Sequence, residues 1–453
     1  MAEIGENKMG VMPVKRLLIS MALPMMVSML VQALYNVVDS LFVARISEKA
    51  LAAVTYAMPL QNLMIAVGAG TGVGVNAMLS KALGEKNKTY SDRAANTAIL
   101  LTIFNFLIFL LVSLFGAGPF IATQTKDAVT AAYGTQYLSI VTGFSFGLMF
   151  QMMFERLLQS TGRTFYSMVS QMTGAIVNII LDPIMIFGLL GFPRLEVAGA
   201  AIATVIGQCI AALVGLVFNL RKNPEITFSF RKIFRFHWKT IRTIYFVGFP
   251  TILMMSIGSV MTYMMNQILN IFSETAVAVF GVYFKIQSFF FMPVFGLNNG
   301  LIPILAYNYG ARKKARINEA LKFAIFLAVC IMVAGTLILN LFPETILAIF
   351  GASEEMYRIG VPALRIISLH FPLAAFGIVM GSIFQAFSQS VYSLIVSVLR
   401  QLVALIPAAY LLTFLGDVVY VWWAFPIAEI MSIVVSVIFF RKVYRKIVAP
   451  MPD

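Results

Sequence analysis

The first apolar run of the chain, LLISMALPMMVSMLVQALYNVVDSLFVA (residues 17–44), is long enough to cross a lipid bilayer as a single helix. Asp39 lies well inside this run. An ionised carboxylate at the centre of a bilayer costs about 2.5–3.5 kcal/mol or more, so an acid at such a place is expected to have a function. The run therefore predicts both a membrane-spanning helix and a functional carboxylate within it.

The composition extends this prediction to the whole chain. Of its 453 residues, 60% are hydrophobic and 11% are charged, and the mean hydropathy is +0.89. A soluble protein of this composition could not cover itself with polar surface, so we expect an integral membrane protein. We expect its spans to be α-helices, which satisfy their own backbone hydrogen bonds in lipid. Twelve apolar runs are long enough to span: 17–44, 52–80, 94–116, 132–154, 164–189, 197–220, 243–272, 277–308, 321–342, 359–385, 391–415 and 419–440.

The charged residues indicate how these spans are oriented. With both termini placed in the cytoplasm, 24 of the 33 Lys and Arg residues fall in inner segments, 5 in outer loops and 4 within spans. This is the positive-inside pattern, so the net charge of +14 reflects topology and contact with lipid. We expect a monomeric, multi-pass protein of the cell membrane with both termini cytoplasmic and no nucleic-acid partner.

Several other classes of protein are disfavoured. The first apolar run is longer than a signal-peptide core, so no cleavable signal is expected. Cys209 and Cys330 lie within predicted spans and imply no disulfide framework. No Walker A motif, metalloprotease helix or Gly-x-Ser-x-Gly motif is found, so we expect neither an enzyme nor a cofactor. GAGTGVGV (residues 68–75) lies within a span, where Gly70 and Gly74 predict close helix packing and not phosphate binding.

The chain repeats itself at one constant offset, the separation of Pro24 from Pro250. The other pairs matched at this offset include Gln61 and Gln287, Gly70 and Gly296, Gly74 and Gly300, Gly84 and Gly310, Gln159 and Gln385, and Tyr166-Ser167 and Tyr392-Ser393. Six spans in each half predict two parallel repeats related by an axis along the membrane normal. We therefore expect an N-lobe (1–220), a cytoplasmic linker (221–242) and a C-lobe (243–453), with the lobes around a central cavity that opens alternately to each side.

The predicted linker contains the stretch FSFRKIFRFHWKTIR (residues 228–242), in which aromatic and basic residues are interleaved. This pattern is typical of an amphipathic segment that lies on the inner membrane surface. An irregular polar linker is the alternative.

Polar residues of the N-lobe fall on shared helix faces. The candidates are Tyr35, Asp39, Asn178, Asp182 and Thr204. Tyr35 and Asp39 are four residues apart, as are Asn178 and Asp182 in NIILDP (residues 178–183), so each pair shares one face. Pro24 can bend the first span because it removes a backbone hydrogen bond. On this reading the N-lobe spans hold two acids and no base.

If the two acids face each other, at least one is expected to be protonated, because burial and a neighbouring like charge both favour the neutral form. The pair then titrates as a unit. It could take up a proton, or it could hold Na⁺ among the oxygens of Asp39, Asp182, Asn178 and Thr204; no other metal is expected. The alternative is that each acid is neutral and merely hydrogen-bonded between helices.

The C-lobe differs at the corresponding positions, where Met265 matches Asp39 and Ala408 matches Asp182. Its spans carry a different charged set, namely Lys285, Arg400 and Glu429. Glu429 could neutralise Arg400 or Lys285 in a structural ion pair, or it could face the cavity and meet a cationic substrate. The sequence leaves both interpretations open.

These features resemble the MATE family, the multidrug and toxic compound extrusion transporters, over nearly the whole chain. The motifs that carry the resemblance are ALP at Ala22–Pro24, the Asp39 span, NIILDP, VAGAAIAT (residues 197–204) and the repeated basic loops LGEKNK (83–88) and YGARKK (309–314). The pattern is most similar to the DinF-like and MepA-like branches, in which the N-lobe acids are expected to carry ion coupling.

The resemblance implies a secondary antiporter that exports organic cations and other amphipathic compounds in exchange for H⁺ or Na⁺. On this resemblance Asp39 and Asp182 would bind the coupling ion, Asn178, Tyr35 and Thr204 would complete its shell, and Pro24 would let the first span bend. A flippase for a lipid-linked saccharide is the alternative, because Lys285 and Arg400 leave room for a phosphate-bearing lipid. The N-lobe acids disfavour that alternative.

Overall fold

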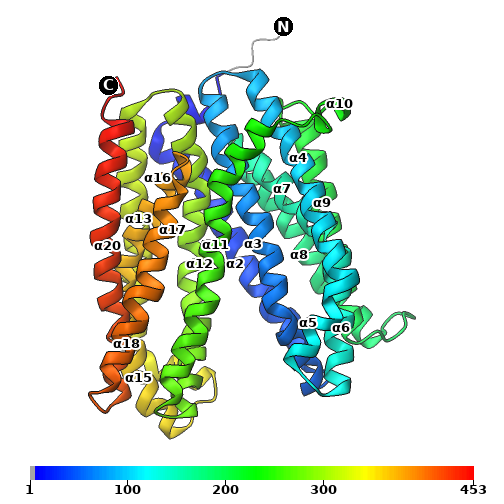
Figure 1. Ribbon diagram of the computed structural model, residues 1–453, viewed down its shortest axis with the longest axis vertical. Coiled ribbons are helices and arrows are strands. Elements are labelled where there is room, and N and C mark those ends of the chain that lie inside the picture. The colour runs from blue at the N-terminus through cyan, green and yellow to red at the C-terminus, as the bar shows by residue number, and fades with distance from the viewer. Residues whose placement is uncertain (1–5, 453) are drawn as a thin grey trace. The chain divides into compact units, whose positions relative to one another are not determined.

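The computed structural model describes residues 6–452, and within that range the chain is all-helical (Figure 1). Ten single helical segments are long and apolar enough to cross a membrane: α2 (Val14–Ala44), α3 (Glu48–Gly84), α4 to α5 (Lys88–Gln124), α8 (Thr164–Phe187), α9 (Val197–Lys222), α11 (Trp238–Asn270), α12 (Glu274–Gly310), α13 (Lys314–Leu341), α17 to α18 (Ser390–Thr413) and α19 to η3 (Val418–Val448). Two further spans are helix pairs bent by 46°, namely α6 (Ala128–Gly143) with α7 (Phe146–Ser160), and α15 (Glu354–Ser368) with α16 (Phe371–Ala386). The described residues thus contain twelve spans when each bent pair counts as one, and the predicted all-α membrane fold is confirmed.

The repeat found in the sequence extends to the helix boundaries. α3 begins at Glu48 and α12 at Glu274, which are separated by the same offset as Pro24 and Pro250, and both helices are 37 residues long. This offset also separates the starts of α4 and α13, of α6 and α15, and of α8 and α17. The caps repeat as well: Ser47 accepts a hydrogen bond from the backbone N–H of Ala50 at 3.0 Å, and Ser273 accepts one from Ala276 at 3.1 Å. We call α2 to α9 the N-terminal repeat and α11 to η3 the C-terminal repeat.

Each repeat supplies helices that run side by side. In the N-terminal repeat α3 packs on α4 and α7, and α9 packs on α7 and α8 (Figure 1). In the C-terminal repeat α13 and α20 both pack on α16, and α12 packs on α13 and α16. The equivalent helices therefore occupy equivalent positions within each repeat, and side chains that differ between them can be compared position by position.

The chain divides into two compact units, and two helices are split between them. Unit 1 takes the chain up to Val11 and Val27–Ile252, and unit 2 takes Met12–Met26 and the chain from Leu253. The first part of α2 therefore belongs to unit 2, and the first part of α11 belongs to unit 1. Each division falls two residues after a proline, Pro24 in α2 and Pro250 in α11. The lobe boundaries expected at residues 220 and 243 stay a prediction.

Glycines hold these exchanged segments close to their neighbours. A Cβ atom at Gly74 of α3 would lie 2.1 Å from the carbonyl oxygen of Ile244 in α11, within unit 1. A Cβ atom at Gly300 of α12 would lie 2.7 Å from Cα of Ala22 in α2, within unit 2. Only glycine permits such approach of two backbones. The prediction that the glycine-rich stretch 68–75 serves helix packing is confirmed.

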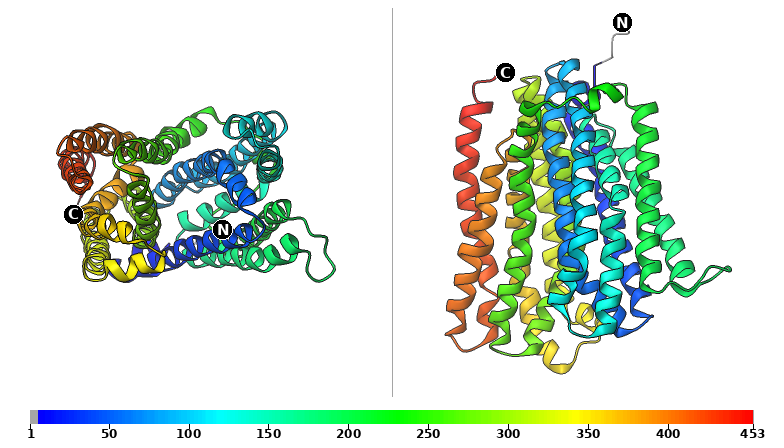
Figure 2. Two further views of the ribbon diagram at one scale, coloured as in Figure 1. Left: turned by 90° about the horizontal axis from the view of Figure 1, so that it is seen from below. Right: turned by 45° about the vertical axis from the view of Figure 1, so that its right-hand side comes forward.

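The loop between α8 and α9 extends away from the helices that it joins (Figure 2). It starts at Gly188, whose φ of +73° lies in the left-handed region and whose Cβ would meet the Arg194 nitrogen at 2.8 Å. Glycine fits both conditions at this C-terminal cap. At the other end of the loop the hydroxyl of Tyr133 donates to the carboxylate of Glu196, which ties the loop to α6.

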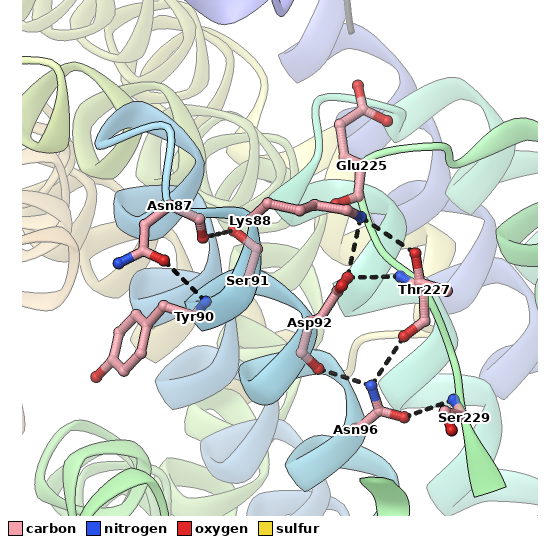
Figure 3. A network of polar contacts seen from close by, with 9 residues as sticks. All are labelled: Asn87, Lys88, Tyr90, Ser91, Asp92, Asn96, Glu225, Thr227 and Ser229. Atoms are coloured by element: carbon pink, nitrogen blue, oxygen red, sulfur yellow. Dashed lines mark hydrogen bonds and ion pairs between the residues drawn. The ribbon is translucent and has the colours of Figure 1, made fainter. Parts of the chain in front are cut away.

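The beginning of the linker is bonded to α4 (Figure 3). Lys88 Nζ contacts Asp92 Oδ1 at 2.9 Å and donates to the Glu225 carbonyl at 2.8 Å. The same Asp92 oxygen accepts from the Thr227 N–H at 2.8 Å, and Asn96 Oδ1 accepts from the Ser229 N–H at 3.0 Å. These bonds satisfy backbone groups of an extended segment, which therefore keeps one path along α4.

The remainder of the linker is less regular than an amphipathic helix. α10 (Phe230–Ile233) is four residues long, and α11 already starts at Trp238, five residues before the predicted span. The irregular linker is thus the alternative that the structure favours for most of residues 228–242. Its aromatic side chains remain exposed, Phe230 by 81% and Trp238 by 65%, so they are available to a membrane surface.

Candidate functional site

The NIILDP segment of α8 forms one wall of a buried polar cluster. Asn178 and Asp182 lie one turn apart on the face of α8 that packs on α9. The two helices approach closely because a Cβ atom at Gly174 would lie only 2.8 Å from the Gly207 carbonyl oxygen. This contact brings Thr204 of α9 next to Asn178. All three polar side chains are buried, with exposures of 2% for Asn178 and Thr204 and 0% for Asp182.

Asn178 connects the two helices through its amide group. With the amide oriented to satisfy its neighbours, Nδ2 donates to Asp182 Oδ2 at 3.1 Å. Its oxygen accepts from the Thr204 N–H at 2.9 Å and from the Thr204 hydroxyl at 3.2 Å. The amide therefore helps to hold the Asp182 carboxyl in place.

Asp39 of α2 lies beside Asp182. The carboxyl groups of Asp39 and Asp182 interact directly, and Tyr35 lies within reach of Thr204 and of both acids. Two carboxyl groups in contact and largely out of water cannot both remain ionised without a cation, so they share a proton or hold a positive ion. The structure thus brings together the five predicted residues, which come from α2, α8 and α9.

One oxygen of this cluster has no bonding partner. Oδ1 of Asp39 is buried and accepts no hydrogen bond from any residue between 6 and 452. Among those residues no group of three or more His, Cys, Asp and Glu side chains could hold a metal ion. The ligands that the cluster offers are oxygens of carboxyl, amide and hydroxyl groups, which suit a proton or a hard cation.

A tyrosine that was not predicted from the sequence lies near the acids. Tyr137 of α6 is 3% exposed, lies within electrostatic reach of Asp39, and directs its hydroxyl toward Gln61 Oε1 at 3.5 Å. A sequence signal existed, because Tyr133 and Tyr137 are four residues apart in AAYGTQYLSI and share a helix face. Nothing in the sequence alone separated this pair from ordinary packing tyrosines.

Pro24 does not belong to the acid cluster. It lies fifteen residues before Asp39 in α2, about 22 Å along the helix axis at 1.5 Å per residue. It also lies in the part of α2 that belongs to unit 2, whereas Asp39 belongs to unit 1. Its bending role stays a prediction.

The expectation of two acids and no base in the N-terminal spans was wrong. α7 continues to Ser160, beyond the predicted end of its span at residue 154, and it contains Glu155 and Arg156. Glu155 is 8% exposed and accepts a hydrogen bond from Gln151 at 3.0 Å, while Arg156 donates to Gln159 at 3.0 Å. Hydropathy ended the span at the first charged residue, but adjacent opposite charges with amide partners can be buried within a helix.

The charged residues of the C-terminal repeat do not all meet. Nη1 of Arg400 lies 3.7 Å from Oε2 of Glu429, and both side chains line a cavity of about 310 Å³ within unit 2. Lys285 is exposed on α12 and is not among the residues lining that cavity. Glu429 therefore has Arg400 and not Lys285 as its cationic neighbour, and its meeting a cationic substrate stays a prediction. His370, 5% exposed, lines the same cavity.

A family model described as MatE matches residues 24–184 and 250–411. The two matched segments start at Pro24 and Pro250, the pair that defines the sequence repeat, and together they cover well over half of the chain. The chain belongs to the MatE family. The resemblance drawn from the motifs is confirmed.

Known relatives cover about nine tenths of the chain. "Multidrug export protein MepA" of Staphylococcus haemolyticus is 26% identical over 422 residues, which are 90% of this chain and 89% of that protein. A "FAD transporter" of Shewanella oneidensis is 25% identical over 431 residues, 92% of each chain. The solved outward-facing structure of a multidrug resistance MATE family transporter superposes on this chain with a TM-score of 0.92, over 98% of each chain. At 23% sequence identity this similarity shows the fold alone.

The family match determines the general class of this protein. It is a multi-pass membrane transporter and not an enzyme. The MepA proteins among the relatives support the MepA-like branch named from the motifs.

Proposed function

We propose that the chain is a secondary active multidrug efflux antiporter that exports organic cations and amphipathic compounds in exchange for H⁺ or Na⁺. The observation that carries the proposal is the direct contact of Asp39 with Asp182, with one Asp39 oxygen left without a partner among residues 6–452. A site of this kind changes its net charge when an ion enters or leaves. We further propose that the protein works as a monomer in the cell membrane with both termini cytoplasmic.

The division of α2 between the two units supports a route for coupling. Asp39 lies in the part of α2 that belongs to unit 1, and Pro24 lies in the part that belongs to unit 2. A change of charge at Asp39 therefore alters the free energy of a helix that both units share. Ion and substrate are coupled when both favour one of two arrangements of such an element. Pro24, which lacks a backbone N–H, is the place where α2 bends most easily.

The relatives support export of drug-like compounds, and they also show the range of related substrates. The MepA proteins are named as multidrug exporters, whereas one similar protein is named as an FAD transporter. The acidic N-terminal cluster favours a cationic substrate or coupling ion over a phosphate-bearing one. We therefore place organic cations first and keep a lipid-linked saccharide or a dinucleotide as outcomes of the test.

The test is gradient-driven transport by the purified chain in liposomes. A fluorescent organic cation is followed under an imposed pH gradient and, separately, under an imposed Na⁺ gradient. We expect export under one of these gradients, and we expect Asp39→Asn to abolish the dependence on that gradient while the protein still inserts. The matched control is Asp127→Asn, which removes an exposed carboxylate outside the spans and keeps an N-cap side chain on α6.

Two results would contradict the proposal. If Asp39→Asn exports as fast as the wild type under the effective gradient, Asp39 is structural and the coupling site is wrong. If the wild type moves no cation under either gradient, the drug-export assignment fails, and transport of FAD or of a lipid-linked saccharide in the same liposomes becomes the next measurement.

A further inference from the structure

The C-terminal repeat contains an aromatic cavity of its own. It has a volume of about 310 Å³, at the lower end of the range for small-molecule sites, and lies wholly within unit 2. Four of its lining side chains are phenylalanines: Phe284, Phe291, Phe295 and Phe425. The polar lining consists of Gln287, Ser288, His370, Arg400, Gln401 and Glu429. An aromatic chamber with one carboxylate is the arrangement that recognises organic cations.

Glu429 is buried and only partly neutralised. Its residue exposure is 3%, and Oε1 accepts no hydrogen bond from any described residue. Oε1 points toward Gly377 of α16, where a Cβ atom would be 3.5 Å away and no side chain is available to bond it. Arg400 stands 3.7 Å from the other oxygen, beyond hydrogen-bond distance. By contrast Arg163 donates to both oxygens of Glu225 at 2.8 and 3.0 Å. We call such a hydrogen-bonded ion pair closed, and a pair beyond hydrogen-bond distance open.

Arg400 has a second polar chamber within reach. It lines both the aromatic cavity and a smaller cavity of about 110 Å³. The smaller cavity is lined by Ser393, Ser397, Ser432, Ser436, Gln385 and Asn298, among others. Two acceptor atoms there, Asn298 Oδ1 and Ser432 Oγ, have no hydrogen-bond partner among residues 6–452. A guanidinium that turned into this chamber would meet hydroxyl and amide oxygens in place of Glu429.

The backbone at Arg400 is also unusual. Residues Leu399–Leu405 form a π-helical segment, η2, between the α-helices α17 and α18. Such segments are wider than an α-helix and occur frequently at functional sites. Arg400 and Gln401, both in η2, line the same cavity.

From these observations we propose that the aromatic cavity binds a compact aromatic organic cation, with Glu429 Oε1 accepting its N–H groups while Arg400 withdraws into the serine-lined chamber. The inference rests on the proposed export function and names a substrate site for it. Gln287 supports a donor-bearing ligand, because its buried Oε1 also lacks a partner among the described residues. An anionic ligand would meet these two acceptor oxygens, so the cavity selects against it in spite of Arg400.

The first test is equilibrium binding to the purified chain in lipid nanodiscs. The probe is proflavine, a planar three-ring cation with amino groups, followed by its fluorescence, and the neutral comparison is acridone, which has a similar shape. We expect Glu429→Gln to weaken proflavine binding at least tenfold and to leave acridone binding within twofold. Glu355→Gln, which removes an exposed carboxylate at the start of α15, is the matched control and should change neither.

The second test uses Arg400. If Arg400 and Glu429 form a purely structural ion pair, removing Arg400 should weaken proflavine binding, which is the opposite of what the proposal predicts. If Arg400 competes with the ligand for Glu429, Arg400→Met should tighten proflavine binding and enlarge the rise in melting temperature that proflavine produces. In the double variant Arg400→Met/Glu429→Gln both effects should disappear. Because gain of affinity requires a folded site, this result cannot arise from misfolding.

Unchanged proflavine binding in Glu429→Gln, or weaker binding in Arg400→Met, would overturn the site while leaving the proposed export function intact. Conversely, loss of gradient-driven export in the Asp39 experiment, with the Glu429-dependent binding retained, would remove the antiport function and leave a cation-binding cavity. The two failures are therefore distinguishable in the same preparations.

Discussion

The span α8 and the span from α17 to α18 hold equivalent positions in the two repeats. They differ in how closely they pack on the neighbouring helix. At the equivalent position the N-terminal repeat has Gly174 and the C-terminal repeat has Arg400. In the facing helices, Ala203 of α9 is equivalent to Glu429 of α20. A Cβ atom at Gly174 would lie 2.8 Å from a carbonyl oxygen of α9, so α8 and α9 touch through their backbones. In the C-terminal repeat, Arg400 and Glu429 instead line a cavity of about 310 Å³, and Arg400 also lines one of about 110 Å³.

This difference shows how one architecture provides two kinds of polar site. Small residues press α8 against α9 and hold Asp182, Asn178 and Thr204 in a rigid frame, where an ion can change the charge but little else moves. In the C-terminal repeat the equivalent positions hold a charged pair beside a cavity whose polar atoms are not all bonded. The first kind of site suits an ion, and the second suits a larger molecule.

The largest effect is expected from Asp182, which has no acidic counterpart at the equivalent position of the C-terminal repeat. Asp182→Asn should reduce gradient-driven export by about 5- to 150-fold, the usual range of a coupling free energy between two sites. Adding Ala408→Asp, which puts a carboxylate at the equivalent C-terminal position, should not restore export, because Met265 stands where a partner acid would be needed. Recovery in the liposome assay would show that the two positions are interchangeable and would break the comparison.

The close backbone contact of α8 and α9 predicts a large loss of stability. Gly174→Leu should lower the free energy of unfolding by about 3 kcal/mol, because the new side chain must displace the Ala211 Cβ and the Gly207 carbonyl. The matched control is Gly281→Leu in α12, where a Cβ atom would have nothing within 4 Å. Thermal unfolding in detergent should separate the two variants, and equal melting temperatures would refute the claim of a rigid frame.

A closed ion pair and an open one should respond differently to loss of the arginine. Arg163→Met leaves the 7%-exposed Glu225 without its bidentate partner and should cost about 2 kcal/mol, since Arg163 itself is partly exposed. Arg400→Met should cost less, because its 3.7 Å contact with Glu429 is already loose. The comparison of the two melting temperatures measures this directly, and the reverse order would mean that Arg400 and Glu429 form the stronger pair.

The smallest effect concerns two helix caps at equivalent positions, Asp127 of α6 and Ser353 of α15. The backbone N–H and the hydroxyl of Thr130, and then Lys49, lower the pKa of Asp127 to about 2. Because this pKa is below its unfolded value, the cap is fully effective above about pH 4 and is lost as the pH falls through about 2. Hydrogen exchange, corrected for intrinsic rates, should accelerate at the start of α6 over that range and not at α15.

Asp127→Asn provides the control for this experiment. It keeps a capping oxygen that does not titrate, so exchange at the start of α6 should then be independent of pH. An acid-induced acceleration that persists in this variant would assign the effect to another group.

The sequence predicted the spans and the repeat well because both depend on long-range periodic features. Hydropathy marks twelve runs, and the offset between Pro24 and Pro250 reappears in the helix ends of α3 and α12. Prediction failed where a local feature was overruled by neighbours. Hydropathy ended the fourth span before Glu155 and Arg156, although Gln151 and Gln159 allow both to lie inside α7. The aromatic and basic pattern of 228–242 indicated one amphipathic segment, but backbone bonds to Asp92 and Asn96 draw its beginning along α4.

What the sequence by itself determined is the class of protein, the helical spans, the two-fold repeat and the helix faces on which Asp39 and Asp182 lie, because these follow from composition and periodicity. Only the tertiary structure decided which faces meet. It brought Asp39 to Asp182 and Tyr137 toward Gln61, and it placed Glu429 beside Arg400 in the wall of an aromatic cavity. The physical reason is that the position of a residue in a helix specifies only the direction in which its side chain points. Which side chain of another helix it meets depends on close contacts such as that at Gly174, and these form only when whole helices pack.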